Sequence, residues 1–338
     1  MTISLTCRSE VGCGMTPEYY GNLYRRYQTY VRQYRSDAPI RKICCGANAT
    51  DYFWTEGVLK TCTAAPAPGP DADNPGFMNG LSLHYYVHPG VWENKGSATE
   101  FDSKTWYQTL FRAVYMEELI RRHGAVMDQY DPEKKIGMMV DEWGCWFDVE
   151  PGTNPGFLYQ QNTMRDALVA GITLNIFNKH CDRVKMACIA QMVNVLQSVI
   201  LTEGSKMILT PTYHVFHMYR HHQDAKLVES CMVGNKIIGE AEYQVPALSE
   251  SVSVSEDGTV NITVGNLSVT EDVPVEISFA ELAPSRIEAA ILTGAMCAHN
   301  TFEEPENVRE TAFNDFKTDG RKVSFTAPAC SIISFRVQ

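Results

Sequence analysis

Up to about residue 220, helix-like segments alternate with short apolar runs along the chain. Apolar side chains recur at every third or fourth position in residues 17–35, 103–123 and 163–177. Nearly wholly apolar runs of strand length lie at residues 40–47, 80–87 and 135–143, and residues 183–201 combine another such run with a helix. Thr16 and Ser103 suit the N-cap positions of the first two helices. Strands that alternate with helices of this length predict a parallel sheet covered by helices.

The last third of the chain has a different pattern. Residues 251–267 and 273–279 alternate apolar and polar side chains, as strands with one buried face do. The Asp-Gly pair at residues 257–258 separates two such runs, which is a strong hairpin signal. We therefore expect an α/β domain at residues 1–223, followed by an all-β domain, an antiparallel β-sandwich, at residues 224–338.

Composition argues against several classes of partner. The 338 residues include 29 Lys and Arg and 40 Asp and Glu, so the net charge is −11, which argues against a nucleic-acid partner and an anionic membrane surface. No apolar run reaches the roughly 18 residues of a membrane span. Residues 1–10 lack the basic head and apolar core of a secretory signal, so we expect a cytoplasmic protein. The proline-rich residues 64–76 are expected to form a loop.

The 11 cysteines fit the same location. Their number is odd, they include the adjacent pair Cys44 and Cys45, and most lie within apolar runs, which favours buried, reduced thiols over a disulfide framework. The tight histidine groupings are His221–His222 and His214 with His217, which are weak candidates for a zinc site. Neither a phosphate-binding loop nor a dinucleotide-binding glycine motif is present. We therefore expect neither a metal nor a cofactor.

Two acidic residues end the apolar run at residues 135–143. Asp141 and Glu142 stand where the carboxyl end of a buried strand is expected, and active sites of parallel α/β barrels collect at that end. A helix N-cap acid or a buried ion pair would explain them equally simply. Aromatic residues follow at Trp143, Trp146 and Phe147, and aromatic rings beside carboxylates are typical of carbohydrate sites.

Further polar residues end two other apolar runs. His84 and Tyr86 have the same parity in the strand at residues 80–87, so their side chains are expected on the same face. They are equally compatible with packing in the core. Gln191 and Asn194 interrupt a third apolar segment, and buried amides need hydrogen-bond partners. Sugar hydroxyls would provide those partners, and so would backbone groups.

Several motifs in a fixed order resemble one enzyme family. They are DEWG at residues 141–144, IAQMVNVLQ at 189–197, GCGMTPEYYGNLYRRYQTYVR at 12–32, SLHYYVHPG at 82–90 and AHNTFEEPENV at 298–308. From about Glu10 to Val337 the chain resembles the C-terminal half of an α-L-arabinofuranosidase of glycoside hydrolase family 51. The resemblance implies a retaining, exo-acting hydrolase built from a (β/α)8 TIM barrel and a β-sandwich. This chain would hold the second half of that barrel, with four of its eight strands.

The resemblance also implies roles for individual residues. Glu142 matches the nucleophile, His84 a residue that orients the catalytic carboxylates, and Tyr86 a residue that hydrogen-bonds the nucleophile. Gln191 matches a contact to the sugar, and Trp143 is a further candidate for binding substrate. Glu10 is the acid/base candidate, although Ser9 stands where the family has an asparagine.

The implied substrate is an arabinose-containing oligosaccharide or polysaccharide. Because half a barrel leaves two exposed strand edges, we expect a homo-oligomer or a complementary chain that supplies the N-terminal half-barrel. Two other interpretations remain open. The chain could be a non-catalytic remnant or split-enzyme subunit that binds sugar or a partner, or a related barrel glycosidase such as an endo-glucanase.

Overall fold

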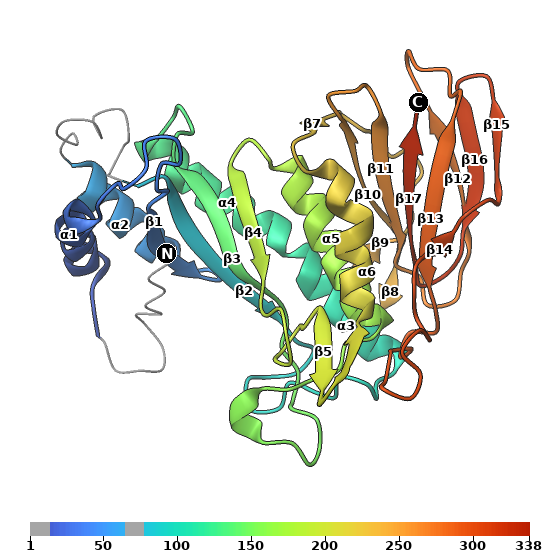
Figure 1. The fold of residues 1–338 in the computed structure, drawn as a ribbon, viewed down its shortest axis with the longest axis horizontal. Helices are drawn as coiled ribbons and strands as arrows, with labels where there is room; N and C mark the ends of the chain where they lie inside the picture. The colour runs from blue at the N-terminus through green and yellow to red at the C-terminus, as the bar shows by residue number, and fades with distance from the viewer. Residues whose placement is uncertain (1–13, 65–77) are drawn as a thin grey trace. The chain divides into compact units, whose positions relative to one another are not determined.

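The computed structural model of the protein describes residues 14–64 and 78–338 (Figure 1). The acid/base candidate Glu10 and all but the first residue of the loop predicted at residues 64–76 lie outside the described residues. The chain divides into two compact units. The first unit comprises the residues up to Tyr86 together with residues 116–143 and 180–188, and the second comprises residues 87–115, 144–179 and 189–338.

The first unit is built around a four-stranded parallel sheet in the order β1-β2-β3-β4, which can be followed in Figure 1. Its strands are β1 (Ile43–Asn48), β2 (Gly80–Val87), β3 (Gly137–Cys145) and β4 (Val184–Ile189). All four were predicted from apolar runs, and the bounds of β2 match the prediction. β1 and β2 approach so closely that a Cβ at Gly46 would lie 1.6 Å from the carbonyl oxygen of Ser82, so this position requires glycine.

In the described part of this unit there are three α-helices, of which α1 packs against α2 and α2 packs against α4. They are α1 (Pro17–Tyr27, extended by the short helix η1, Gln28–Tyr30), α2 (Tyr52–Thr63) and α4 (Met116–Tyr130). Thr16 caps α1 as predicted, since its hydroxyl accepts a hydrogen bond from the amide of Tyr19 at 3.2 Å. The helical turns end at Tyr30, however, and not at Arg35. Sequence analysis missed α2, although Asp51 is a good N-cap and caps it through Trp54.

Two further helix predictions were wrong. Residues 103–123 do not form one helix, because α3 (Ser103–Val114) and α4 are separate elements on either side of Tyr115. The N-cap of α3 is Asp102 and not Ser103, because the Asp102 carboxylate accepts hydrogen bonds from both the amide and the hydroxyl of Thr105. The helix expected within residues 183–201 is replaced by an irregular segment between Ile189 and β5.

The second unit contains the antiparallel strands of the last third of the chain. Its main sheet has the order β14-β13-β17-β11-β10-β7, and a smaller sheet has the order β12-β16-β15. The strands are β7 (Lys226–Leu227), β10 (Leu248–Val254), β11 (Val260–Asn266), β12 (Val273–Ser278), β13 (Ile287–Thr293), β14 (Thr311–Ala312), β15 (Phe316–Asp319), β16 (Lys322–Ala327) and β17 (Ser331–Val337). The predicted hairpin joins β10 to β11, and Gly258 at its turn has φ +85°. Buried side chains of both sheets form one core around Phe313, Phe325 and Phe335.

Three helices and two hairpins complete this unit. The helices are α3, α5 (Met164–Lys179) and α6 (Pro211–Tyr219, extended by η5, Arg220–His222), and the hairpins are β5 (Ile200–Glu203) with β6 (Lys206–Leu209) and β8 (Ile237–Glu240) with β9 (Tyr243–Pro246). α5 packs on β10, β11 and β17. No helix within residues 14–64 and 78–338 is long and apolar enough to cross a membrane. The predicted fold class, α/β followed by an antiparallel β-sandwich, is confirmed.

Candidate active site

The carboxyl ends of β2 and β3 bring four polar side chains together in the first unit. Tyr86 donates its hydroxyl hydrogen to Glu142 Oε2 at 3.1 Å. His84 Nδ1 lies 3.5 Å from the same oxygen, and His84 Nε2 lies 3.1 Å from Asp141 Oδ1 without the alignment of a hydrogen bond. The predicted convergence of His84 and Tyr86 on Glu142 is therefore found in the structure. The contact with Asp141 was not predicted.

Sequence analysis singled out Asp141 beside Glu142 but did not predict its contact with His84. Successive side chains of a regular strand point to opposite faces, so alternation alone does not bring both carboxylates to one ring. The His84 imidazole nevertheless lies within 3.5 Å of both carboxylates. In the sequence, the only indication of this contact was the pair of adjacent acidic residues at the end of the strand.

The histidine and the tyrosine of this cluster have shifted pKa values. Burial alone would lower the pKa of His84, but the contact with Asp141 and the charge of Glu142 outweigh it and raise the pKa above its ordinary value. Burial and the neighbouring Glu142 charge raise the pKa of Tyr86, so its hydroxyl stays protonated and remains a donor. The Glu142 carboxylate thus faces a hydroxyl donor and an imidazole whose pKa is raised.

A buried histidine on α4 supports the backbone beside His84. The carbonyl of His84 accepts a hydrogen bond from the amide of Ala49, which follows β1 with φ +47°. The carbonyl of Ala49 lies 2.7 Å from His123 Nε2, and His123 Nδ1 lies 2.8 Å from the Thr55 hydroxyl. Burial lowers the pKa of His123, so the ring is neutral and uses one nitrogen as donor and the other as acceptor. The loop after β1 is thereby fixed against the strand that carries His84.

The last two residues of the DEWG motif have structural explanations. Trp143 is 1% exposed and belongs to the buried core of the first unit. Gly144 has φ +129°, and a Cβ there would lie 2.5 Å from Cγ of Gln197. Gln197 is itself fixed, because its amide donates to the buried carboxylate of Asp166 at 2.6 Å. Glycine is therefore required at the end of the strand that carries Glu142.

Gln191 lies in the second unit, in the irregular segment after β4, where its side chain is exposed. The prediction of a buried amide at this position was wrong, because the chain leaves the sheet at Ile189 and does not continue as an apolar helix. Asn194 is partly buried and donates its amide to the hydroxyl of Thr202 at 2.7 Å. Backbone and hydroxyl groups of the protein thus satisfy Asn194, one of the two alternatives that the sequence left open.

Aromatic side chains of the second unit form a cluster of their own. The rings of Trp92 and Trp146 meet edge to face with centroids 5.0 Å apart. The ammonium group of Lys95 lies 4.4 Å from the centre of the Trp92 ring and 5.5 Å from that of Trp146. Trp92 is 44% exposed, whereas Phe147 is buried. Of these two predicted aromatic residues, Trp146 therefore contacts the partly exposed ring of Trp92, whereas Phe147 is buried.

Cysteines and acidic side chains form no metal site in the described ranges. Within residues 14–64 and 78–338, no group of three or more His, Cys, Asp or Glu side chains is placed to hold a metal ion. None of the nine described cysteines forms a disulfide, and Cys44, Cys45, Cys62, Cys145 and Cys330 are buried.

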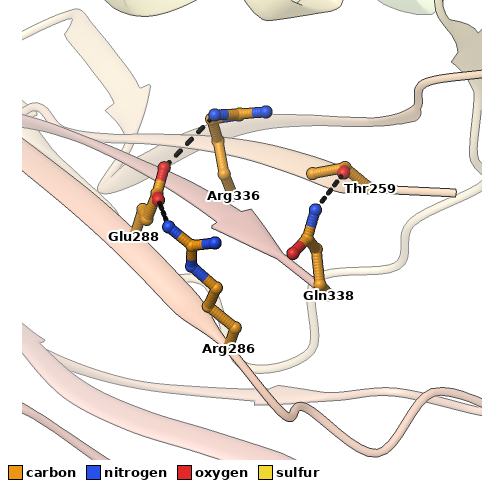
Figure 2. Close-up of a pocket in the computed structure, with 5 residues that line it drawn as sticks. All are labelled: Thr259, Arg286, Glu288, Arg336 and Gln338. Carbon is orange, nitrogen blue, oxygen red and sulfur yellow. Dashed lines mark hydrogen bonds and ion pairs between the residues drawn. The ribbon is translucent and has the colours of Figure 1, made fainter. Parts of the chain in front are cut away.

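A polar pocket of about 200 Å³ lies on the main antiparallel sheet (Figure 2). Figure 2 shows that Arg286 and Arg336 both reach Glu288, at 2.5 and 3.2 Å, and that Gln338 contacts Thr259. Since one carboxylate already joins both arginines and all three charged side chains are partly exposed, the pocket is explained as a surface ion-pair network.

Comparison with known proteins places this site in a family. Residues 141–331 match the family model of the α-L-arabinofuranosidase C-terminal domain. The chain is 40% identical over 330 residues to the intracellular exo-α-L-arabinofuranosidase of Bacteroides ovatus, covering 97% of this chain and 62% of that protein. It also resembles the crystal structure of the GH51 arabinofuranosidase from Xanthomonas axonopodis pv. citri, with a TM-score of 0.88 and 43% identity.

The match to the Xanthomonas structure covers 97% of this chain and 64% of the Xanthomonas chain. This chain therefore spans less than two thirds of the length of either relative. The α-L-arabinofuranosidase of Thermotoga maritima shares the fold at 23% identity, with a TM-score of 0.77 over 99% of this chain and 65% of that one. The fold is accordingly a partial (β/α)8 barrel followed by a β-sandwich. The chain belongs to the α-L-arabinofuranosidase C-terminal domain family and corresponds to the C-terminal portion of a glycoside hydrolase family 51 arabinofuranosidase.

Proposed function

We propose that this chain carries the nucleophile of a retaining glycoside hydrolase that releases terminal α-L-arabinofuranosyl groups from arabinose-containing oligosaccharides or polysaccharides. The single observation that carries the proposal is the position of Glu142, whose Oε2 lies 3.1 Å from the Tyr86 hydroxyl and 3.5 Å from His84 Nδ1. The names of the relatives, which are exo-α-L-arabinofuranosidases, support this substrate class.

In this mechanism Glu142 attacks the anomeric carbon and forms a covalent arabinosyl ester. Retention requires a second carboxyl group about 5–5.5 Å from the nucleophile, which first protonates the leaving oxygen and then activates water. Glu10 is proposed for that role. The Tyr86 hydroxyl and the His84 imidazole both contact Oε2 of Glu142 and so orient its carboxylate for attack. His84 and Tyr86 are therefore positioning residues that act through Glu142.

Gln191 is proposed as a sugar contact, because its exposed amide supports hydrogen bonding to sugar hydroxyls. Trp143, the other candidate for binding substrate, is 1% exposed, so no direct sugar contact is proposed for it. We also propose a domain boundary between residues 223 and 224, a position supported by the end of η5 at His222 and the start of β7 at Lys226.

We further propose an intracellular location, supported by the printed names of the Bacteroides and Streptomyces lividans relatives. The proposed assembly is a homo-oligomer or a complex with the N-terminal half-barrel. The parallel sheet, in which β1 and β4 each pair with one strand within the described residues, supports association at those edges.

The test compares Glu142→Gln with Glu10→Gln on aryl α-L-arabinofuranosides that have good and poor leaving groups. The chain is assayed alone and together with the part of the Bacteroides relative that it does not span. Glu142→Gln should lose several orders of magnitude in kcat on both substrates, because the amide cannot attack the anomeric carbon. Glu10→Gln should lose least on the good leaving group, which needs no proton, and azide should partly restore its turnover.

The exposed Glu256→Gln serves as the matched control and should leave both rates unchanged. Equal losses on both substrates would remove Glu10 from the mechanism. Absence of hydrolysis by the natural sequence under both conditions would contradict the proposal and favour a non-catalytic remnant.

A further inference from the structure

The imidazole of His84 contacts two carboxylates, one at each ring nitrogen. Nδ1 lies 3.5 Å from Glu142 Oε2, and Nε2 lies 3.1 Å from Asp141 Oδ1. The other histidine–carboxylate contacts in the described ranges involve one carboxylate each, and they are His180 with Glu117 and His217 with Glu310. The surroundings of His84 therefore differ from those of an ordinary histidine ion pair.

The place of the ring between two carboxylates selects its protonation state. A neutral imidazole has one N–H group and one lone pair, whereas the cation has two N–H groups. In the neutral ring, the nitrogen without hydrogen would point its lone pair at a carboxylate oxygen. The cation directs an N–H toward Asp141 and another toward Glu142, so the geometry favours the cation.

Burial makes the contact with Asp141 the stronger of the two. The side chains of His84 and Asp141 are 8% and 9% exposed, whereas that of Glu142 is 36% exposed. Charges that water screens poorly interact more strongly, so Asp141 contributes more to the protonation of the ring. Burial by itself would lower the pKa of His84, and the two carboxylates together raise it above its ordinary value.

Within the described residues, the charges that act on His84 come from β3 alone, through Asp141 and Glu142. β1 pairs with His84 through Asn48, which carries no charge. Burial raises the pKa values of a hydroxyl and a thiol on the neighbouring elements and lowers that of a second histidine. These three uncharged groups are Tyr86 on β2, Cys188 on β4 and His123 on α4.

The charge on His84 matters when Glu142 forms the covalent ester. As an oxygen of Glu142 bonds to the anomeric carbon, the glycosidic bond breaks and its electron pair leaves with the departing oxygen, which the second carboxyl group protonates. Glu142 thereby loses its negative charge, while the His84 protons stay in place. A cation left alone in a buried position is costly, and the Asp141 carboxylate compensates it throughout the reaction.

We propose that Asp141 is a positioning residue for the nucleophile, because it holds the His84 imidazole in the doubly protonated form that directs an N–H toward Glu142. Asp141 acts through His84 and does not itself contact the reacting atoms. The inference rests on the proposed function, to which it adds the residue that sets the alkaline limit of ester formation.

The first experiment requires no activity. The full chain is labelled with ¹³C at the Cε1 atoms of its histidines and titrated by NMR, and the His84 signal is assigned with His84→Gln. In the natural sequence His84 should titrate above pH 6.5, and Asp141→Asn should lower its pKa. Asp182→Asn, which removes a half-exposed carboxylate just before β4, is the matched control and should leave the His84 titration unchanged.

Two further variants keep this titration decisive. Asp141→Glu retains the negative charge and should keep the His84 titration above pH 6.5. Circular dichroism checks that each variant is folded, and Asp141→Ser replaces Asp141→Asn if the asparagine variant is unfolded.

The second experiment measures the rate of ester formation against pH. The donor is a 2-fluoro-arabinofuranoside with a good leaving group, which needs no proton, so the second carboxyl group does not set the alkaline limit. The chain is assayed alone and with the part of the Bacteroides relative that it does not span. Asp141→Asn should move the alkaline limb to lower pH, whereas Asp182→Asn should leave it in place. A merely structural loss would lower the rate at every pH without moving the limb.

A lowered His84 pKa together with a shifted alkaline limb in Asp141→Asn supports the proposal. Titration of His84 at or below pH 6.5 in the natural sequence would overturn it, and so would an alkaline limb that Asp182→Asn moves equally. Ester formation with a His84 titration that Asp141→Asn leaves unchanged would overturn the positioning role alone. If His84 responds as expected but no ester forms under either condition, the proposed function fails and the positioning role fails with it.

Discussion

The parallel sheet and the antiparallel sheets of this protein differ in how completely they cover their own apolar side chains. The antiparallel core is closed, with Phe335 at 1% exposure and Val323 and Ile333 at 0%. In the first unit β3 is buried along most of its length, but β4, which has an equally apolar sequence, leaves Met186 37% exposed and Cys188 exposed.

The difference shows that an apolar strand predicts burial only if its neighbours are present. Antiparallel strands of a sandwich find partners within a short stretch of chain, so the C-terminal sheets are complete by themselves. Parallel sheets need covering on both faces and a neighbour at each edge. In the described part of the first unit, apolar side chains at α1 and on β4 therefore stay partly in water, as Tyr27 and Met186 do.

The largest expected change in the unfolding free energy comes from a substitution in the core of the antiparallel sheets, compared with one on β4. Phe335→Ala should destabilise the protein by about 3–5 kcal/mol, because the ring packs against Phe325 with centroids 4.9 Å apart and its removal leaves a cavity. Met186→Ala on β4 should cost less than about 1 kcal/mol, since the side chain is already partly in water. Urea unfolding of both variants measures the difference, and similar losses would show that β4 is as well covered as the sandwich.

Histidines of the two regions should respond oppositely to pH. The pKa of His84 is raised, so its contribution to stability is present below pH 6.5 and is lost as the pH rises through the folded-state pKa. Burial lowers the pKa of His222, between the hydroxyls of Ser253 and Thr263, to about 4. As the pH falls from 6.5 toward 4, the histidine is protonated in the unfolded state while the buried ring stays neutral. The unfolding free energy therefore falls by about 3 kcal/mol.

Unfolding free energies measured between pH 4 and 9 test this contrast. His222→Gln should flatten the acidic side of the profile, and His84→Gln should change the side above pH 6.5. A profile that neither substitution alters would contradict the electrostatic account of both regions.

The smallest change in the unfolding free energy is expected at Tyr27, the last residue of α1. Tyr27→Ser should change the unfolding free energy of the chain by no more than about 0.5 kcal/mol, because its ring is 66% exposed. Tyr20→Ser, which removes a buried ring and the hydroxyl held by Cys45, should cost several times more. Equal losses in thermal and urea unfolding would mean that Tyr27 already packs against its own chain.

Local pattern was sufficient to predict much of this fold. The apolar run at residues 80–87 coincides with β2, and the Asp-Gly pair at 257–258 marks the turn between β10 and β11. The break at Tyr115 escaped prediction, because its backbone angles remain helical and the apolar spacing runs on into α4. The exposure of Gln191 also escaped, because it depends on where the chain leaves the sheet, which no local spacing encodes.

The candidate site was predicted in part for the same reason. Parity placed His84 and Tyr86 on one face of their strand, and the resemblance to the family implied that both act on Glu142 at the end of the next strand. The contact between Asp141 and His84 breaks the alternation of a regular strand and required the structure. The full burial of Trp143 likewise depends on packing partners that are distant in the sequence.

The most direct test of the account is to trap the covalent intermediate. The chain, alone and with the unmatched part of its Bacteroides relative, is incubated with a 2-fluoro-arabinofuranosyl donor that has a good leaving group, and digested peptides are analysed by mass spectrometry. The account predicts a fluoroarabinosyl adduct on Glu142 and none in Glu142→Gln. An adduct on another residue, or no adduct under either condition, would contradict the assignment of Glu142 as the nucleophile.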